Sequence, residues 1–179
     1  MKEVDNEVMI DIETLGTSAD AVICTIGAVV FDARGSTICD RLELRPDMAE
    51  QTDNHHRRIN ADTVDWWEKQ SPEAIDEAIS DRDRIPFKDA MAELHKFCRN
   101  RKAIWANGVC FDITILENAW HELNIAPPWD FWTVRDARTV YDLCGVSIKD
   151  GHVTSHKAVE DAEHQAVVVQ RAYRKLFLS

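Results

Sequence analysis

The sequence contains no apolar run long enough to span a bilayer, and residues 1–6 lack the charged-then-apolar pattern of a secretory signal. These two absences predict a cytoplasmic protein. The five cysteines include no Cys-x-x-Cys pair, and their odd number leaves at least one unpaired. Reduced thiols in a reducing compartment are therefore expected, and a zinc site is not.

Basic residues are scarce, since 21 Lys and Arg against 32 Asp and Glu give a net charge of -11. Sequence-independent affinity for phosphates comes mostly from Lys and Arg, so this balance argues against a broad electrostatic surface for nucleic acid. It does not argue against a protein that holds one strand end through bound cations, because each cation reverses the local sign of an acidic site. Weak binding over a short footprint is expected in that case.

The chain also lacks internal repeats, low-complexity tracts and linker-like changes of composition, so residues 1–179 are expected to form a single domain. Short β-prone runs separated by turn residues fill the first third and predict a meander of three strands. Helical periodicity and two further short strands alternate after residue 61. The expected strands are 7–12, 22–31, 36–44, 103–106 and 132–135, and the expected helices start near 61, 87, 112, 137 and 157. This order predicts an α/β fold in which helices flank a mixed β-sheet.

Four carboxylates and one histidine carry the chemistry that the sequence suggests. They are Asp11, Glu13, Asp112, Asp161 and His156. Hard divalent cations prefer oxygen ligands, and a water molecule beside them needs a base. If the segments converge, these residues form the inventory of a two-cation phosphodiester hydrolase.

Asp11 and Glu13 lie two apart in a β-prone run, so both carboxylates point to the same face of the strand. An exposed strand edge would also explain an isolated Asp-x-Glu, but the apolar flanks place this pair beside the core. Asp112 follows a strand and opens a helix, at the end of the sheet where α/β proteins bind ligands. The helix dipole alone also favours an acid there.

His156 precedes the last helix and Asp161 lies within its start, so the imidazole can overhang the opening that Asp161 faces. A neutral imidazole is suited to accept a proton from water near neutral pH. Simple solvent exposure is the alternative for a histidine in a polar loop. Among the remaining histidines, His152 is expected to come nearest to the site.

The ordered set Asp11-x-Glu13, Asn107-x4-Asp112 and His156-x4-Asp161 resembles the three motifs of the DEDDh branch of 3'-5' exonucleases. The segments 10–17 and 66–74 are most similar to phage DexA-type exonucleases and to the mycobacterial exoribonuclease RNase AS. The resemblance implies a ribonuclease H-like fold and release of nucleoside 5'-monophosphates from the 3' end of single-stranded nucleic acid. Relatives of this kind also suggest a homodimer.

The resemblance implies a role for each of the five motif residues. Asp11, Glu13 and Asp161 would hold one Mg²⁺ or Mn²⁺ that carries the attacking water. Asp11 would share a second ion with Asp112, and His156 would accept the proton of the water. Two cations about 3.5–4 Å apart can clamp both oxygens of an in-line displacement.

Substrate contacts are expected beside these ligands. By the same resemblance Thr14 would contact the terminal 3'-hydroxyl, Leu15 would wedge against the last base, and Asn107 would support the backbone or the motif loop. Trp66 and Trp67 could offer a stacking surface worth about 1–3 kcal/mol per base. Because adjacent helical residues point in different directions, a core role is the alternative for one of them.

Three points stay open at this stage. The choice between DNA and RNA rests on 2'-hydroxyl contacts, which cannot be placed from the sequence. A non-enzymatic acidic protein that mimics nucleic acid would also explain the net charge of -11, although a mimic should carry its acids in solvent-facing rows. The other tryptophans, at positions 105, 120, 129 and 132, are expected in the core or at a dimer surface.

Overall fold

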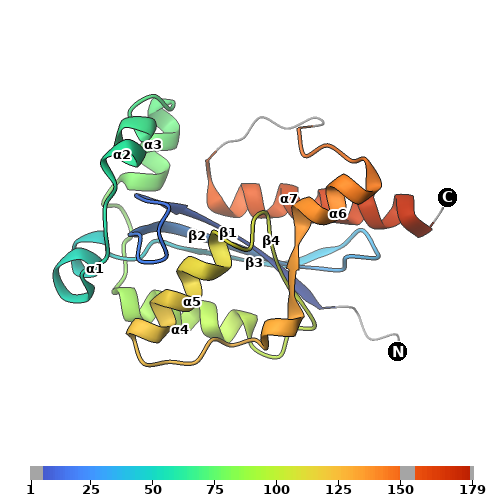
Figure 1. The fold of residues 1–179 in the computed structure, drawn as a ribbon, viewed down its shortest axis with the longest axis horizontal. Coiled ribbons are helices and arrows are strands. Elements are labelled where there is room, and N and C mark those ends of the chain that lie inside the picture. The colour runs from blue at the N-terminus through green and yellow to red at the C-terminus, as the bar shows by residue number, and fades with distance from the viewer. Residues whose placement is uncertain (1–5, 150–155, 178–179) are drawn as a thin grey trace.

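The computed structural model describes residues 6–149 and 156–177 and contains a five-stranded mixed sheet (Figure 1). The strand order is β3-β2-β1-β4-β5. The first three strands form the expected antiparallel meander, and β4 and β5 extend it in parallel with β1. The strands are β1 (Glu7–Thr14), β2 (Ile23–Phe31), β3 (Ile38–Leu44), β4 (Ile104–Ala106) and β5 (Val134–Asp136). The predicted α/β architecture is confirmed.

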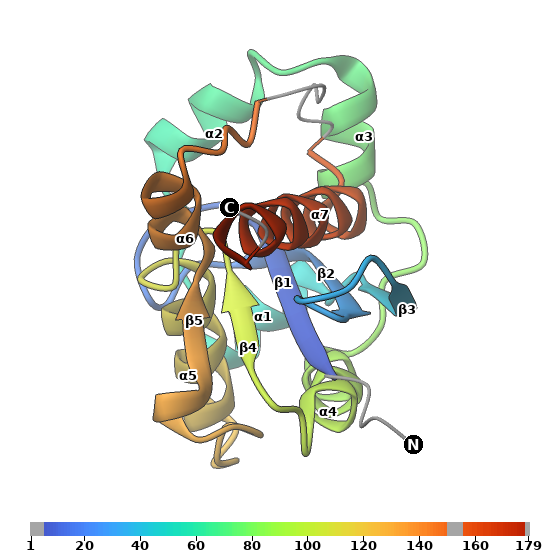
Figure 2. The same ribbon diagram turned by 90° about the vertical axis from the view of Figure 1, so that its right-hand side faces the viewer.

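Helices cover both faces of the sheet (Figures 1 and 2). One face packs on α4 (Phe87–Cys98) and α5 (Asp112–Glu122), and the other on α6 (Ala137–Cys144) and α7 (Ala158–Phe177). A third group, α1 (Met48–His55), α2 (Ala61–Trp67) and α3 (Pro72–Ile79), lies beyond the end of the strands in Figure 1. Within the described ranges no helix combines the length and apolarity that a membrane span requires.

The two faces of β1 carry different kinds of residue. Val8, Ile10 and Ile12 are buried against α4 and α5. The alternate positions face the other way, where Met9 packs in the core beneath α7. Strand periodicity therefore turns Asp11, and Glu13 with it, toward the side of the sheet that α7 covers.

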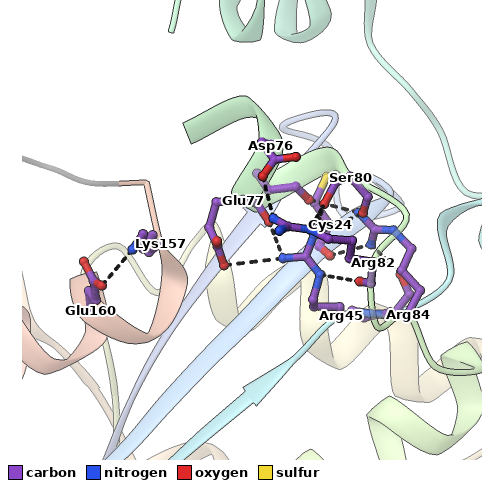
Figure 3. Close-up of polar contacts among 11 residues, drawn as sticks. Cys24, Arg45, Asp76, Glu77, Ser80, Arg82, Arg84, Lys157 and Glu160 are labelled. Atoms are coloured by element: carbon purple, nitrogen blue, oxygen red, sulfur yellow. Dashed lines mark hydrogen bonds and ion pairs between the residues drawn. The ribbon is translucent and has the colours of Figure 1, made fainter. Parts of the chain in front are cut away.

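Two half-buried arginines connect α3 to the sheet (Figure 3). Arg45 donates hydrogen bonds to the carbonyl and hydroxyl oxygens of Ser80, at 3.1 and 3.0 Å. Arg84 donates to the carbonyls of Cys24 and Ala78, at 2.9 and 3.0 Å. Since Cys24 belongs to β2 and Ala78 to α3, one guanidinium joins the two elements. These bonds fix α3 relative to the strands.

The structure corrects several details of the expected element pattern. Helix α1 was not predicted, although Asp47 caps it by accepting a hydrogen bond from the Glu50 N–H at 2.8 Å. Only one residue of α1 is buried, so it has no apolar stripe that would reveal it. Trp132 was expected in a strand, but it lies in a 3-10 helix (Phe131–Thr133) with 62% of its surface exposed. Of the two expected places for Trp132, the core is therefore wrong, and the dimer surface stays a prediction.

Candidate active site

The structure brings all five motif residues to one cavity, which we call the catalytic cavity. Asp11 and Glu13 extend from β1, and Asp112 lies in the first turn of α5. Asp161 lies in the first turn of α7, and His156 stands just before that helix. Residues separated by up to 150 positions thus line one opening.

Close packing of α7 on the sheet makes this convergence possible. Gly27 of β2 pairs directly with Asp11 across the sheet. A Cβ atom built on Gly27 would lie 2.1 Å from the backbone of Ala158 and Val159, where α7 begins. No side chain fits there, so a glycine is required for the close approach of the helix backbone. That approach brings Asp161 over the strand that carries Asp11.

Glu13, His156 and Asp161 form the tightest group, with candidate ligand atoms all within 4.8 Å of one another. His156 Nδ1 lies 3.8 Å from Glu13 Oε1, and this carboxylate raises the pKa of His156 above its usual value. The rings of Trp66 and Trp67 contact the imidazole edge-on, with centroids 5.2 and 5.8 Å away. The imidazole is therefore held between two indoles and a carboxylate.

Asp11 and Asp112 are the carboxylates least compensated by the protein. Burial raises the pKa of Asp11, and the nearby carboxylates of Asp112 and Glu13 raise it further. Burial also raises the pKa of Asp112 to about 7. Asp11 accepts a hydrogen bond from Gln165 Nε2 at 2.7 Å, and Asp112 accepts one from the Ile12 N–H at 3.2 Å. These bonds orient the carboxylates without neutralising them.

The donor set of the catalytic cavity fits divalent cations. Two further oxygens that belong to cavity residues, Asn107 Oδ1 and Gln165 Oε1, are buried and have no hydrogen-bond partner in the described part of the chain. Clustered carboxylate and amide oxygens are ligands that Mg²⁺ and Mn²⁺ prefer, and bound cations would relieve the repulsion among the acids. The four carboxylates are the residues that fit such ions.

A second cavity, the terminal cavity, adjoins the first and shares Ile12, Glu13 and Phe111 with it. Thr14 and Trp66 line this second cavity. Both cavities, with volumes of ≈ 310 and ≈ 410 Å³, lie in the size range of small-ligand pockets, about 300–1,000 Å³.

The two adjacent tryptophans have different environments. Trp66 is 42% exposed, whereas Trp67 is 2% exposed and donates from Nε1 to the Thr14 carbonyl at 2.9 Å. Trp67 lines the terminal cavity but is anchored in the core, so Trp66 provides the accessible aromatic surface. Leu15 is buried in the same apolar cluster as Trp67 and lines neither cavity, and the Thr14 hydroxyl donates to the Gly16 carbonyl at 2.6 Å.

Sequence reasoning did not assign seven of the residues that line the catalytic cavity: Ile12, Phe111, Arg138, Ile148, Lys149, His164 and Gln165. Gln165 could have been found, because it follows Asp161 by four residues and therefore lies on the same face of α7. No spacing from a motif residue marked Arg138, because this residue reaches the site from α6. His152 lies outside the described residues.

Together, the mixed sheet and this oxygen-rich cavity at the junction of β1, α5 and α7 define a ribonuclease H-like nuclease of the DEDDh exonuclease class. Comparison with known proteins gives the particular family. The chain belongs to the family described as the 3'-5' exoribonuclease Rv2179c-like domain, whose model matches residues 6–173. The expected DEDDh membership is confirmed, and an enzyme is favoured over a non-enzymatic mimic of nucleic acid.

Individual relatives agree with this assignment. The exodeoxyribonuclease of Enterobacteria phage T4 is 25% identical over 203 residues, which cover 93% of this chain and 88% of the phage protein. A zinc-bound complex of E. coli exonuclease I with single-stranded DNA has a similar fold, with a TM-score of 0.70 at 13% identity. The match covers 94% of this chain but only 40% of exonuclease I.

A second solved structure matches over nearly its whole length. The nuclease domain of 3'hExo, a DEDDh family member bound to rAMP, has a TM-score of 0.60 at 12% identity. The match covers 95% of this chain and 92% of that domain. At these identities the structural likeness establishes the fold.

Proposed function

We propose that this protein hydrolyses single-stranded nucleic acid from the 3' end and releases nucleoside 5'-monophosphates, with two bound Mg²⁺ or Mn²⁺ ions. The convergence of four carboxylates and His156 on one cavity carries the proposal. Family membership supports the chemistry and the strand end. The family description names an exoribonuclease and the phage relative is an exodeoxyribonuclease, so the test includes both sugars.

The four carboxylates would hold the ions. Asp11, Glu13 and Asp161 would serve one ion, and Asp11 with Asp112 the other. When bound, such ions lower the pKa of water and stabilise charge on the attacking and leaving oxygens of an in-line displacement. The raised pKa values of Asp11 and Asp112 support this assignment. Buried carboxylates repel one another, and bound cations would offset that repulsion.

His156 would act as the general base. Its neutral imidazole accepts a proton from the attacking water as the new oxygen–phosphorus bond forms and the bond to the 3'-oxygen breaks. Glu13 and the two flanking indoles orient the ring. Removing such a base lowers the rate by about 10²–10⁴-fold.

The terminal cavity would hold the 3'-terminal nucleoside, with its base against the exposed face of Trp66. Phe111 lines both cavities, so it stands where the terminal nucleotide meets the scissile phosphate. Asn107 lines the catalytic cavity through an amide whose oxygen has no partner in the described ranges.

The proposal is tested with 5'-labelled DNA and RNA strands of the same sequence, single-stranded and duplex, in Mg²⁺, Mn²⁺ or EDTA. The expected result is a ladder shortening stepwise from the 3' end, present with either ion and absent in EDTA. Asp11→Asn and His156→Ala should abolish or sharply reduce the ladder, while His121→Ala, at an exposed position on α5, should preserve it. If neither strand shortens with either ion, the proposal is wrong.

A further inference from the structure

A third cavity continues the catalytic cavity on a different side from the terminal cavity. It shares Asn107, Arg138, Ile148 and Lys149 with the catalytic cavity, whereas the terminal cavity shares none of these. We call it the exit cavity. The three hollows therefore form a row, with the carboxylates in the middle.

Positive charge is confined to one end of this row. Among the Lys and Arg residues in ranges 6–149 and 156–177, only Arg138 and Lys149 line any of the three cavities, and both stand where the catalytic and exit cavities meet. The terminal cavity contains no Lys or Arg and includes the carboxylates of Glu13 and Asp62. The exit cavity includes one carboxylate, that of Asp142, against the two cations, so its lining is positive on balance. One end of the row therefore suits a neutral group, and the other suits an anion.

Both cationic side chains are exposed and available. Neither forms a side-chain hydrogen bond or ion pair with another residue of the described ranges. The Arg138 guanidinium lies beside Gly108, 3.6–3.8 Å from the position of a Cβ built there. Gly108 has a φ of 129°, a conformation that other residues rarely adopt, so a glycine is favoured in the loop beside this guanidinium.

We propose that Arg138 and Lys149 bind the backbone phosphates that precede the 3'-terminal nucleotide, and that their position sets the direction in which the strand lies across the site. This inference rests on the proposed function. The 3' end of a strand is an uncharged hydroxyl, whereas a 5' end that carries a phosphate is anionic, and every step from the 3' end in the 5' direction adds a phosphate. In a protein with a net charge of -11, a strand is repelled least when its neutral end enters the terminal cavity and its phosphates pass the two cations.

A different role for Arg138 has to be separated from phosphate binding. The guanidinium also lowers the pKa of Asp112, against the larger effect of burial. Loss of Arg138 through that route would slow hydrolysis equally for every strand length. If Arg138 binds phosphate, the effect of its removal should instead grow with the number of upstream phosphates, because a dinucleotide has only the scissile one.

The kinetic test compares Arg138→Ala, Lys149→Ala and the double variant on a dinucleotide and an octamer of the sugar that the wild type cleaves. Each single substitution should lower kcat/KM on the octamer about three- to tenfold, mainly through KM, and less on the dinucleotide. Arg138→Lys should recover most of the loss, because a point charge also binds phosphate. Lys88→Ala, at an exposed position on α4, should match the wild type on both strands.

A binding experiment without metal gives an independent measurement. Fluorescence anisotropy of a 5'-labelled octamer in EDTA measures Kd at several salt concentrations. The slope of log Kd against log salt concentration should be about 0.7 smaller for each phosphate contact that a variant removes. Equal losses on both strand lengths with an unchanged salt slope would overturn the inference. If the wild type cleaves nothing and the two cations still govern the salt slope, the proposed function fails while the strand path stands.

Discussion

His156 Nδ1 lies 3.8 Å from Glu13 Oε1, so the proposed base and a proposed cation ligand are one coupled pair. In the metal-free protein the carboxylate favours the protonated imidazole and raises the pKa of His156. Glu13→Gln should therefore lower the titration midpoint of His156, as followed by NMR of the ring protons in EDTA. An unchanged His156 midpoint would mean that the pair is not coupled in solution.

The metal-free protein should lose stability as the pH rises toward 7. Burial raises the pKa of Asp112 from 3.8 to about 7, so between these values the folded state binds more protons than the unfolded state. The free energy of unfolding therefore falls with increasing pH across this window, by at most about 1.4 kcal/mol per pH unit for one such group. Thermal unfolding in EDTA at pH 5.5, 6.5 and 7.5 measures this trend.

Two additions sharpen the pH experiment. Asp112→Asn removes the buried negative charge and should raise the stability of the metal-free protein at pH 7.5 by more than about 1 kcal/mol. Mg²⁺ or Mn²⁺ should raise the melting temperature of the wild type more at pH 7.5 than at pH 5.5, since ligands must be deprotonated. A metal effect that does not change with pH would argue against these carboxylates as ligands.

Gly27→Ala should damage both stability and activity. The added methyl group would meet the backbone of Ala158 and Val159 at 2.1 Å, and backbone cannot rotate away as a side chain can. We expect a loss of about 1–3 kcal/mol and a displaced α7, which separates Asp161 from Asp11. Gly35→Ala is the matched control, because its nearest contact is the end of the Asp32 side chain, which can move. Urea unfolding and strand hydrolysis should both distinguish the two variants.

Trp66→Ala and Trp67→Ala should separate substrate binding from folding. Trp66 is 42% exposed, so Trp66→Ala should lose about 1–3 kcal/mol of stacking energy with the substrate base. KM for single strands should rise as a result, with little change in melting temperature. Trp67 is 2% exposed and bonded to the Thr14 carbonyl, so its removal should cost about 3–5 kcal/mol of stability. The reverse pattern would contradict the placement of the two rings.

Local patterns predicted much of the site. The two-residue period of β1 indicated that Asp11 and Glu13 share a face, and the chain order indicated the mixed sheet. Other features depend on packing between distant segments, which no local period encodes. The contact of Gly27 with Ala158 and the approach of Arg138 to the catalytic cavity are both of this kind.

The hydrogen bonds that Arg45 and Arg84 donate near α3 limit which residues of this protein can change. Arg84 donates only to backbone carbonyls, those of Cys24, Pro46 and Ala78, and most bonds from Arg45 in this region also end on carbonyls. Every residue type has a carbonyl, so the outer side chains of α3 are free to vary without detaching the helix. Arg45 and Arg84 are not free to vary, because a lysine cannot span several carbonyls from one ammonium centre. The outer face of α3 can therefore diversify while the two arginines stay fixed.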